Sequence, residues 1–122
     1  MATFAEHNFG NDGAMEYLAL LTAKLVATIT EIMADPERLE LDEDGESMLM
    51  PSVEILALLC ERYEAMPPKP TTVRQWSQKY LAVYGRGVEK TTTDAHFKTA
   101  RRKVIDHTFR WLESLSETYW DR

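Results

Sequence analysis

Residues 12–33 read DGAMEYLALLTAKLVATITEIM, and the spacing of their apolar residues decides the fold class. Apolar side chains recur there every three or four residues, which places them along one side of an α-helix. These positions are Ala14, Leu18, Leu21, Leu25, Ile29 and Ile32. Asn11 or Asp12 can accept hydrogen bonds from the first turn, and Pro36 ends the helix because it disfavours helical geometry in the residue before it. The stretch therefore predicts a first buried helix.

The same periodicity predicts two more helices in the middle of the chain. One runs from about residue 47 to 66, with Pro51 tolerated in its first turn. Its buried face is expected to hold Leu49, Val53, Leu56, Leu59 or Cys60, and Tyr63, widened by Ile55 and Leu58. The next helix follows the proline-rich connector 66–70, with Thr72 as its N-cap and Gly85 at its end. Its apolar stripe is Val73, Trp76, Tyr80 and Val83.

A last helix is expected from Asp94 to about Tyr119. Its predicted stripe is Phe97, Ala100, Val104, Thr108, Trp111, Leu115 and Tyr119. Alternation of apolar and polar residues, which strands would require, is missing over any useful length. The chain is therefore predicted to be all-α: a four-helix bundle-like single domain over residues 1–122, with an acidic loop between the first two helices.

Charge is distributed unevenly along the chain, whose net charge is −6. Residues 1–66 carry 14 acids against 3 bases, and residues 67–122 carry 6 acids against 11 bases. The simplest interpretation is that the two halves attract each other in the folded chain. The same uneven charge could instead be balanced between two copies in a homodimer, or by a protein partner with a basic surface.

The densest acidic stretch, residues 35–46, is the first candidate site. A solvated acidic loop can steer a basic partner toward the chain and mask its surface. The candidate partner-binding residues are Glu40, Asp42, Glu43, Asp44 and Glu46. We therefore expect a non-enzymatic protein-interaction module, of the kind that acts as an immunity-type or regulatory inhibitor. An EF-hand in this stretch is excluded because Pro51 falls where the bidentate glutamate would be needed, and weaker cation binding stays open.

The alternative function is a nucleic-acid-binding regulator that uses the last helix. A basic helix after a glycine-containing turn can enter a major groove. The residues of this face are Lys98, Arg101, Arg102 and Arg110. A pI near 5.0 and the acidic first half weigh against it, since both would repel phosphates.

Residue patterns for catalysis or cofactors are missing from the sequence. His96 and His107 lie about three helical turns apart, so they are too distant to share a metal ion. Cys60 lies in an apolar run, which suits a small buried side chain better than a reactive thiolate. We expect no metal, no cofactor and no enzyme activity.

The location is predicted to be cytoplasmic. The N-terminal residues lack the basic start and apolar core of a signal peptide, and Thr, Lys or Glu interrupts each apolar stretch before the ~20 residues of a membrane span. Aromatic residues at both ends of the chain either pin these ends to the bundle or contact a partner. They are Phe4, Phe9, Tyr119 and Trp120.

Several motifs, in order along the chain, resemble a bacterial family called domain of unknown function 4259. They are the opening Phe9-Gly10-Asn11-Asp12-Gly13-Ala14, the acidic stretch leading into Pro51-Ser52-Val53-Glu54, Trp76 after the proline-rich connector, and the ending Tyr119-Trp120-Asp121. Phe4 stands where the family has tryptophan, and Ala5 and His7 stand where it has glycines. The resemblance implies a helical fold and a bacterial origin. It implies no activity.

Overall fold

The computed structural model of this chain describes residues 6–40, 43–89 and 94–121. Within these ranges each regular element is a helix, so the all-α class is confirmed. The elements are α1 (Asp12–Met33), α2 (Pro36–Leu39), the π-helical turn η1 (Gly45–Leu49), α3 (Met50–Tyr63), α4 (Pro70–Val88) and α5 (Ala95–Trp120).

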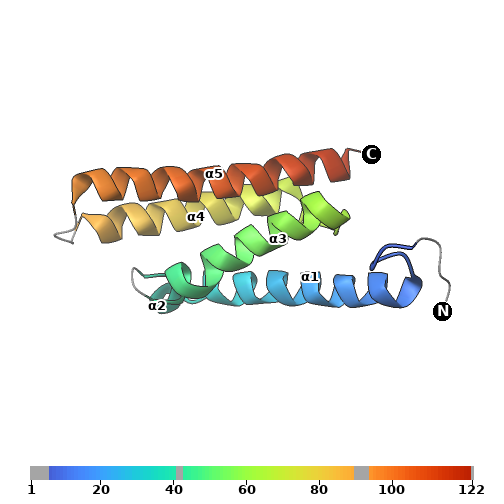
Figure 1. Cartoon of the computed structure of the whole chain (residues 1–122). Coiled ribbons are helices and arrows are strands. Elements are labelled where there is room, and N and C mark those ends of the chain that lie inside the picture. Colours follow the sequence, from blue (N-terminus) through green and yellow to red (C-terminus); the bar gives the residue numbers. More distant parts are fainter. Residues whose placement is uncertain (1–5, 41–42, 90–93, 122) are drawn as a thin grey trace.

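The helices are arranged around α3 (Figure 1). Helices α4 and α5 lie side by side and run in opposite directions, and α3 packs on α5. On its other side α3 packs on α1, which is thereby placed at the edge of the molecule. α1 makes its tertiary contacts mainly with α3, α2 and η1, and α3 separates most of it from the α4–α5 hairpin.

The core lies where α3 meets its neighbours. Side chains with no exposed surface come from α1, η1, α3, α4 and α5 and form one cluster. They include Ile29, Ile32, Leu49, Val53, Leu56, Val73, Ile105 and Leu112. Complete burial of a Val, Leu or Ile side chain is worth roughly 1.5–3 kcal/mol, so this cluster is the main source of stability.

The predicted cap Asn11 is confirmed, and Asp94, where the last helix was expected to begin, also acts as a cap. The Asn11 side chain accepts a hydrogen bond from the Ala14 N–H at 2.8 Å, and the Asp94 side chain accepts one from the His96 N–H at 3.1 Å. A long-range contact closes the other end of α1, where Lys79 Nζ donates to the Met33 carbonyl oxygen at 2.6 Å. A cation is favourable at that position because the last carbonyls of a helix carry partial negative charge.

Both predicted ends of α4 are wrong. The helix begins at Pro70, with Lys69 as the N-cap and no side-chain cap bond, because proline fits the first helical turn and its missing N–H costs nothing there. It also continues through Gly85 to Val88, and neither Gly85 nor any other described glycine has positive φ. Packing along α5 outweighs the ~1 kcal/mol cost of a glycine inside a helix.

The predicted buried faces need three corrections. In α1, Leu21 was expected on the buried side, but 37% of its surface is exposed. In α5 the buried residues are Ile105, Thr108, Phe109, Leu112 and Ser116, whereas Phe97 and Val104 are exposed. In α3 the predicted extra residues Ile55 and Leu58 are about half exposed, at 47% and 48%. These helices carry more apolar residues than one buried face can hold. Periodicity alone therefore assigned some exposed apolar residues to the buried face.

Candidate functional site

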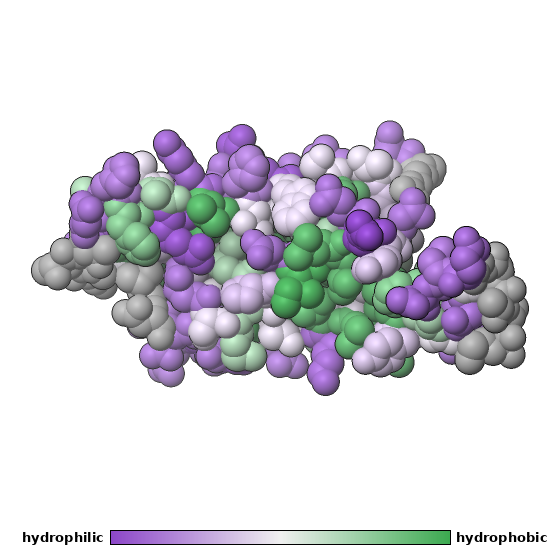
Figure 2. Space-filling view, in the orientation of Figure 1, coloured by the Kyte–Doolittle hydropathy of each residue, from purple (hydrophilic) through white to green (hydrophobic). Residues whose placement is uncertain are grey.

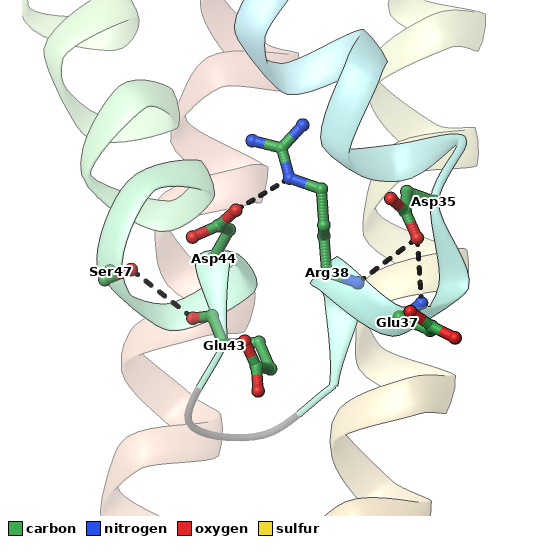
Figure 3. Close-up of polar contacts among 6 residues, drawn as sticks. All are labelled: Asp35, Glu37, Arg38, Glu43, Asp44 and Ser47. Carbon is green, nitrogen blue, oxygen red and sulfur yellow. Dashed lines mark hydrogen bonds and ion pairs between the residues drawn. The ribbon is translucent and has the colours of Figure 1, made fainter.

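The acidic segment, residues 35–46, contains helix α2 and leads into η1. Asp35 caps α2 by accepting hydrogen bonds from the N–H groups of Glu37 at 3.1 Å and Arg38 at 3.4 Å. Arg38 Nε then donates to Asp44 Oδ2 at 2.7 Å (Figure 3). Asp35 and Asp44 therefore fix the shape of the segment through contacts within it.

Three other acids of the segment face solvent. Glu37, Glu40 and Glu43 are exposed, and Figure 3 shows the carboxylates of Glu37 and Glu43 pointing away from the Arg38–Asp44 pair. The remaining predicted residue, Asp42, lies outside the described residues. Five residues were predicted to contact a partner, and four of them are described. Of these four, Glu40 and Glu43 are exposed, whereas Asp44 and Glu46 are partly buried.

Glu46 is turned into the molecule. Its Oε1 accepts a hydrogen bond from the Tyr80 hydroxyl at 3.3 Å, and its Oε2 lies 3.4 Å from Arg101 Nη2. Burial raises the pKa of the Tyr80 hydroxyl, and the nearby negative charge of Glu46 raises it further. The pKa of Tyr84 is raised by the same two causes in the same order. Glu46 therefore fixes the acidic segment to α4 and α5.

The predicted basic face of α5 is partly neutralised within the chain. Arg101 pairs with Glu46, and Arg110 Nε lies 2.9 Å from Asp106 Oδ2 one turn away. The backbone carbonyl of Lys98 accepts a hydrogen bond from Tyr84 at 3.4 Å. Of the four predicted residues, Arg102 is exposed and has no ion pair with a described residue.

Metal-binding geometry does not occur in the described part of the chain, where no three His, Cys, Asp or Glu side chains converge. Cys60 is buried, as predicted, with 7% of its surface exposed. Burial raises the pKa of its thiol to about 11. The side chain is therefore a neutral thiol at physiological pH.

Periodicity of the sequence did not reveal the exposed apolar surface of α1. Only five of its 22 residues are buried. Four large apolar side chains of this helix are exposed: Met15, Tyr17, Leu20 and Leu21, with exposed fractions of 40%, 61%, 70% and 37%. The available signal was that residues 13–30 carry only two charges, on Glu16 and Lys24, so the helix is apolar on more than one side.

A groove of about 600 Å³ follows one side of α1. It is lined by α1 from Met15 to Ala27, by the connector 64–68, and by Tyr119 and Trp120 at the end of α5. On the face drawn in Figure 2, hydrophobic surface also gathers where α3 lies over α1. By length and composition alone α1 could cross a membrane, with a mean hydropathy of 1.2 in its most apolar window.

Trp120 attaches the end of α5 to the connector before α4. Trp120 Nε1 donates to the Pro67 carbonyl oxygen at 3.0 Å, and Lys69 Nζ lies 5.5 Å from the centre of the Trp120 ring. At the other end of the chain, the rings of Phe9 and Tyr63 pack with their centroids 4.5 Å apart. The predicted contact residue Phe4 lies outside the described residues.

Comparison with protein-family models, with curated proteins and with solved structures finds no match for this chain. The resemblance to domain of unknown function 4259 therefore stays a prediction.

Proposed function

We propose that this chain is a non-enzymatic protein-interaction module and that α1 is the helix through which it contacts another protein chain. One observation carries the proposal: α1 is apolar on several sides, yet most of its surface is uncovered. A helix that is apolar all round is normally buried. Large exposed apolar patches on otherwise polar proteins mark interaction sites.

The acidic segment is the second contact surface in this proposal. The bundle-like arrangement of helices serves as its scaffold, because Glu46 anchors the segment on Arg101 of α5, while Asp44 pairs with Arg38 inside the segment. Glu40 and Glu43 are left to attract a partner with a basic surface. Charges of this kind mainly raise the rate of association with a partner of opposite charge. Added salt screens them and lowers that rate. An immunity-type or regulatory inhibitor is the role that suits such a surface.

The test compares capture of protein partners from a host lysate by the tagged full chain and by two variants. Leu20→Glu places a charge on the exposed surface of α1, where 70% of the leucine is accessible. Phe97→Glu is the matched control, because Phe97 is 57% exposed on α5. The proposal expects one stoichiometric partner that Leu20→Glu loses and Phe97→Glu keeps. Equal capture by all three proteins would refute the role of α1.

The acidic contact has a separate test. Glu40→Ser combined with Glu43→Ser should slow partner association at low salt and flatten its salt dependence. The matched control is Glu54→Ser combined with Glu61→Ser, which removes the same charge from exposed positions on α3. If both double variants change association equally, net charge explains the effect, and the acidic segment has no specific role.

Nucleic-acid binding by α5 stays as the alternative, and the exposure of Arg102 and Lys103 is the observation that favours it. The pairing of Arg101 and Arg110 with acids weakens it. A gel shift at low salt that Arg101→Ala with Arg102→Ala abolishes would establish this function. The absence of any shift with the wild-type chain would remove it.

A further inference from the structure

One strip of α1 has a charge pattern that complements itself. Glu16, Leu20 and Lys24 follow one another at four-residue spacing, so they share one side of the helix. All three are exposed, and Leu20 has the largest exposed fraction, 70%, among the exposed large apolar residues of the described chain. Neither Glu16 nor Lys24 has an ion pair with a described residue. The strip therefore has a negative end, an apolar centre and a positive end.

We infer that the protein chain covering α1 is a second copy of this chain, packed antiparallel on the Glu16–Leu20–Lys24 strip. A two-fold axis at Leu20 places Leu20 against its own counterpart. It also places Glu16 opposite Lys24 of the second copy, and Lys24 opposite Glu16 of the second copy. Such a self-complementary contact is the requirement of a two-fold interface.

Distances along the helix fit this pairing. Glu16 and Lys24 each lie about 6 Å from Leu20 along the axis, at a rise of ~1.5 Å per residue. In an antiparallel pair, Glu16 of one copy therefore lies at the same position along the helix axis as Lys24 of the other copy. The same axis sets Gly13 against Ala27 at each end of the contact, and these small residues allow helix axes to approach to roughly 8–10 Å. Parallel packing would oppose like charges and is disfavoured.

The inference rests on the proposed function, because it names the partner of α1. A membrane is the competing cover for an apolar helix. Helices that lie on membranes carry basic residues on their polar face, whereas the charged residues of α1 are Asp12, Glu16, Lys24 and Glu31. A second copy accounts for both the apolar surface and the order of the charges.

Sedimentation equilibrium of the purified full chain measures the outcome directly. We expect a concentration-dependent mass that approaches twice 14.1 kDa. Leu20→Glu should leave a monomer, and Phe97→Glu should leave the dimer unchanged. Circular dichroism checks that both variants keep their helices, which is expected because both side chains are exposed.

Charge exchange tests the register. Glu16→Lys alone, or Lys24→Glu alone, converts two attractive pairs into two repulsive pairs and should raise the dissociation constant about tenfold. Combining both substitutions in one chain should restore the wild-type value. Mixing the two single variants should also restore it, because each chain then offers the charges that the other lacks. An interaction within one chain could not give rescue by mixing.

Three results would overturn the inference: a monomer at all concentrations, a dimer indifferent to Leu20→Glu, or single charge variants that mixing fails to rescue. In the first of these cases, sedimentation of the monomer with phosphatidylcholine vesicles would assign α1 to a membrane. The proposed function is tested separately. A monomer that loses a captured partner through Leu20→Glu would keep that function with a different protein, whereas a monomer unaffected in capture would end both proposals.

Discussion

Glu46 Oε2 lies 3.4 Å from Arg101 Nη2, so one member of the predicted acidic site neutralises one member of the predicted basic site. The two residues come from η1 and α5, at opposite ends of the charge asymmetry along the chain. The contact supports the interpretation that part of this asymmetry is satisfied within the fold. It also means that substituting either residue tests stability as well as binding.

The Glu46–Arg101 contact predicts a modest energetic coupling. Both side chains keep 24–30% of their surface exposed, so solvent weakens their attraction. A double-mutant cycle with Glu46→Gln and Arg101→Ala should give a coupling of about 0.2–1 kcal/mol in urea unfolding. A coupling near zero would show that Glu46 holds the acidic segment through Tyr80 alone. The Arg110–Asp106 pair on the surface of α5 is the comparison, and its coupling should be no larger.

Two glycines predict opposite effects of the same substitution. A Cβ added at Gly45 would lie 2.9 Å from the Leu39 carbonyl oxygen and 3.0 Å from a Tyr80 ring carbon. Gly45→Ala should therefore lower the free energy of unfolding by about 1–3 kcal/mol. A Cβ at Gly85 would meet only the Arg102 guanidinium, at 3.7 Å. Gly85→Ala should raise the free energy of unfolding by up to about 1 kcal/mol, because alanine favours the helix. Thermal unfolding of both variants checks the pair, and stabilisation by Gly45→Ala would contradict the close packing at η1.

Cys60 predicts a loss of stability in mild alkali. Burial raises the pKa of its thiol from 9.0 to about 11, so the unfolded chain ionises first as pH rises. The contribution is fully present below pH 9 and declines as pH rises toward 11. Linkage gives a decline of about 1 kcal/mol between pH 9 and pH 10. Cys60→Ala should be less stable at neutral pH but should lose less stability across that interval. Equal slopes for the two proteins would contradict the assignment to Cys60.

Ser116 predicts the strength of the attachment between α5 and the connector. Its side chain is fully buried, and its hydroxyl donates to the Pro68 carbonyl oxygen at 2.5 Å. Ser116→Ala leaves that carbonyl without its donor and should cost about 1–3 kcal/mol in urea unfolding. Thr118→Ala is the control, because Thr118 is exposed and donates only to Ser114 in its own helix. An equally small effect of both variants would show that water replaces the Ser116 hydroxyl.

Local chemistry explains which parts of the fold were predictable. Asn11 and Asp94 cap their helices through side-chain oxygens, and Pro36 follows the end of α1, so each boundary is set by residues a few positions apart. The end of α4 was not predictable in this way. Gly85 normally ends a helix, and here the neighbouring α5 keeps the backbone helical. A boundary decided by a neighbouring helix is invisible to local rules.

The candidate sites were only partly predictable for the same reason. The sequence identifies Glu40, Glu43, Asp44 and Glu46 as a group, but only the fold shows that Glu46 turns toward Arg101. Periodicity correctly identified Leu18, Ile29 and Ile32 as buried residues of α1, but it placed the exposed Leu21 among them. Leu20 is exposed because, among the described helices, α3 is the main long neighbour of α1 and covers a different side.

The position of α1 at the edge of the fold has a consequence for its synthesis. A ribosome releases this apolar helix before α3, its main neighbour, has been made. Helices α4 and α5 follow each other directly and can pair as soon as both have emerged, since contacts close in sequence form early. Helix α1 therefore emerges before its main neighbour, and its side that carries Leu20 stays exposed even in the complete fold. An unshielded apolar helix is a binding site for chaperones and a starting point for aggregation, so this chain is expected to depend on chaperones early in its translation.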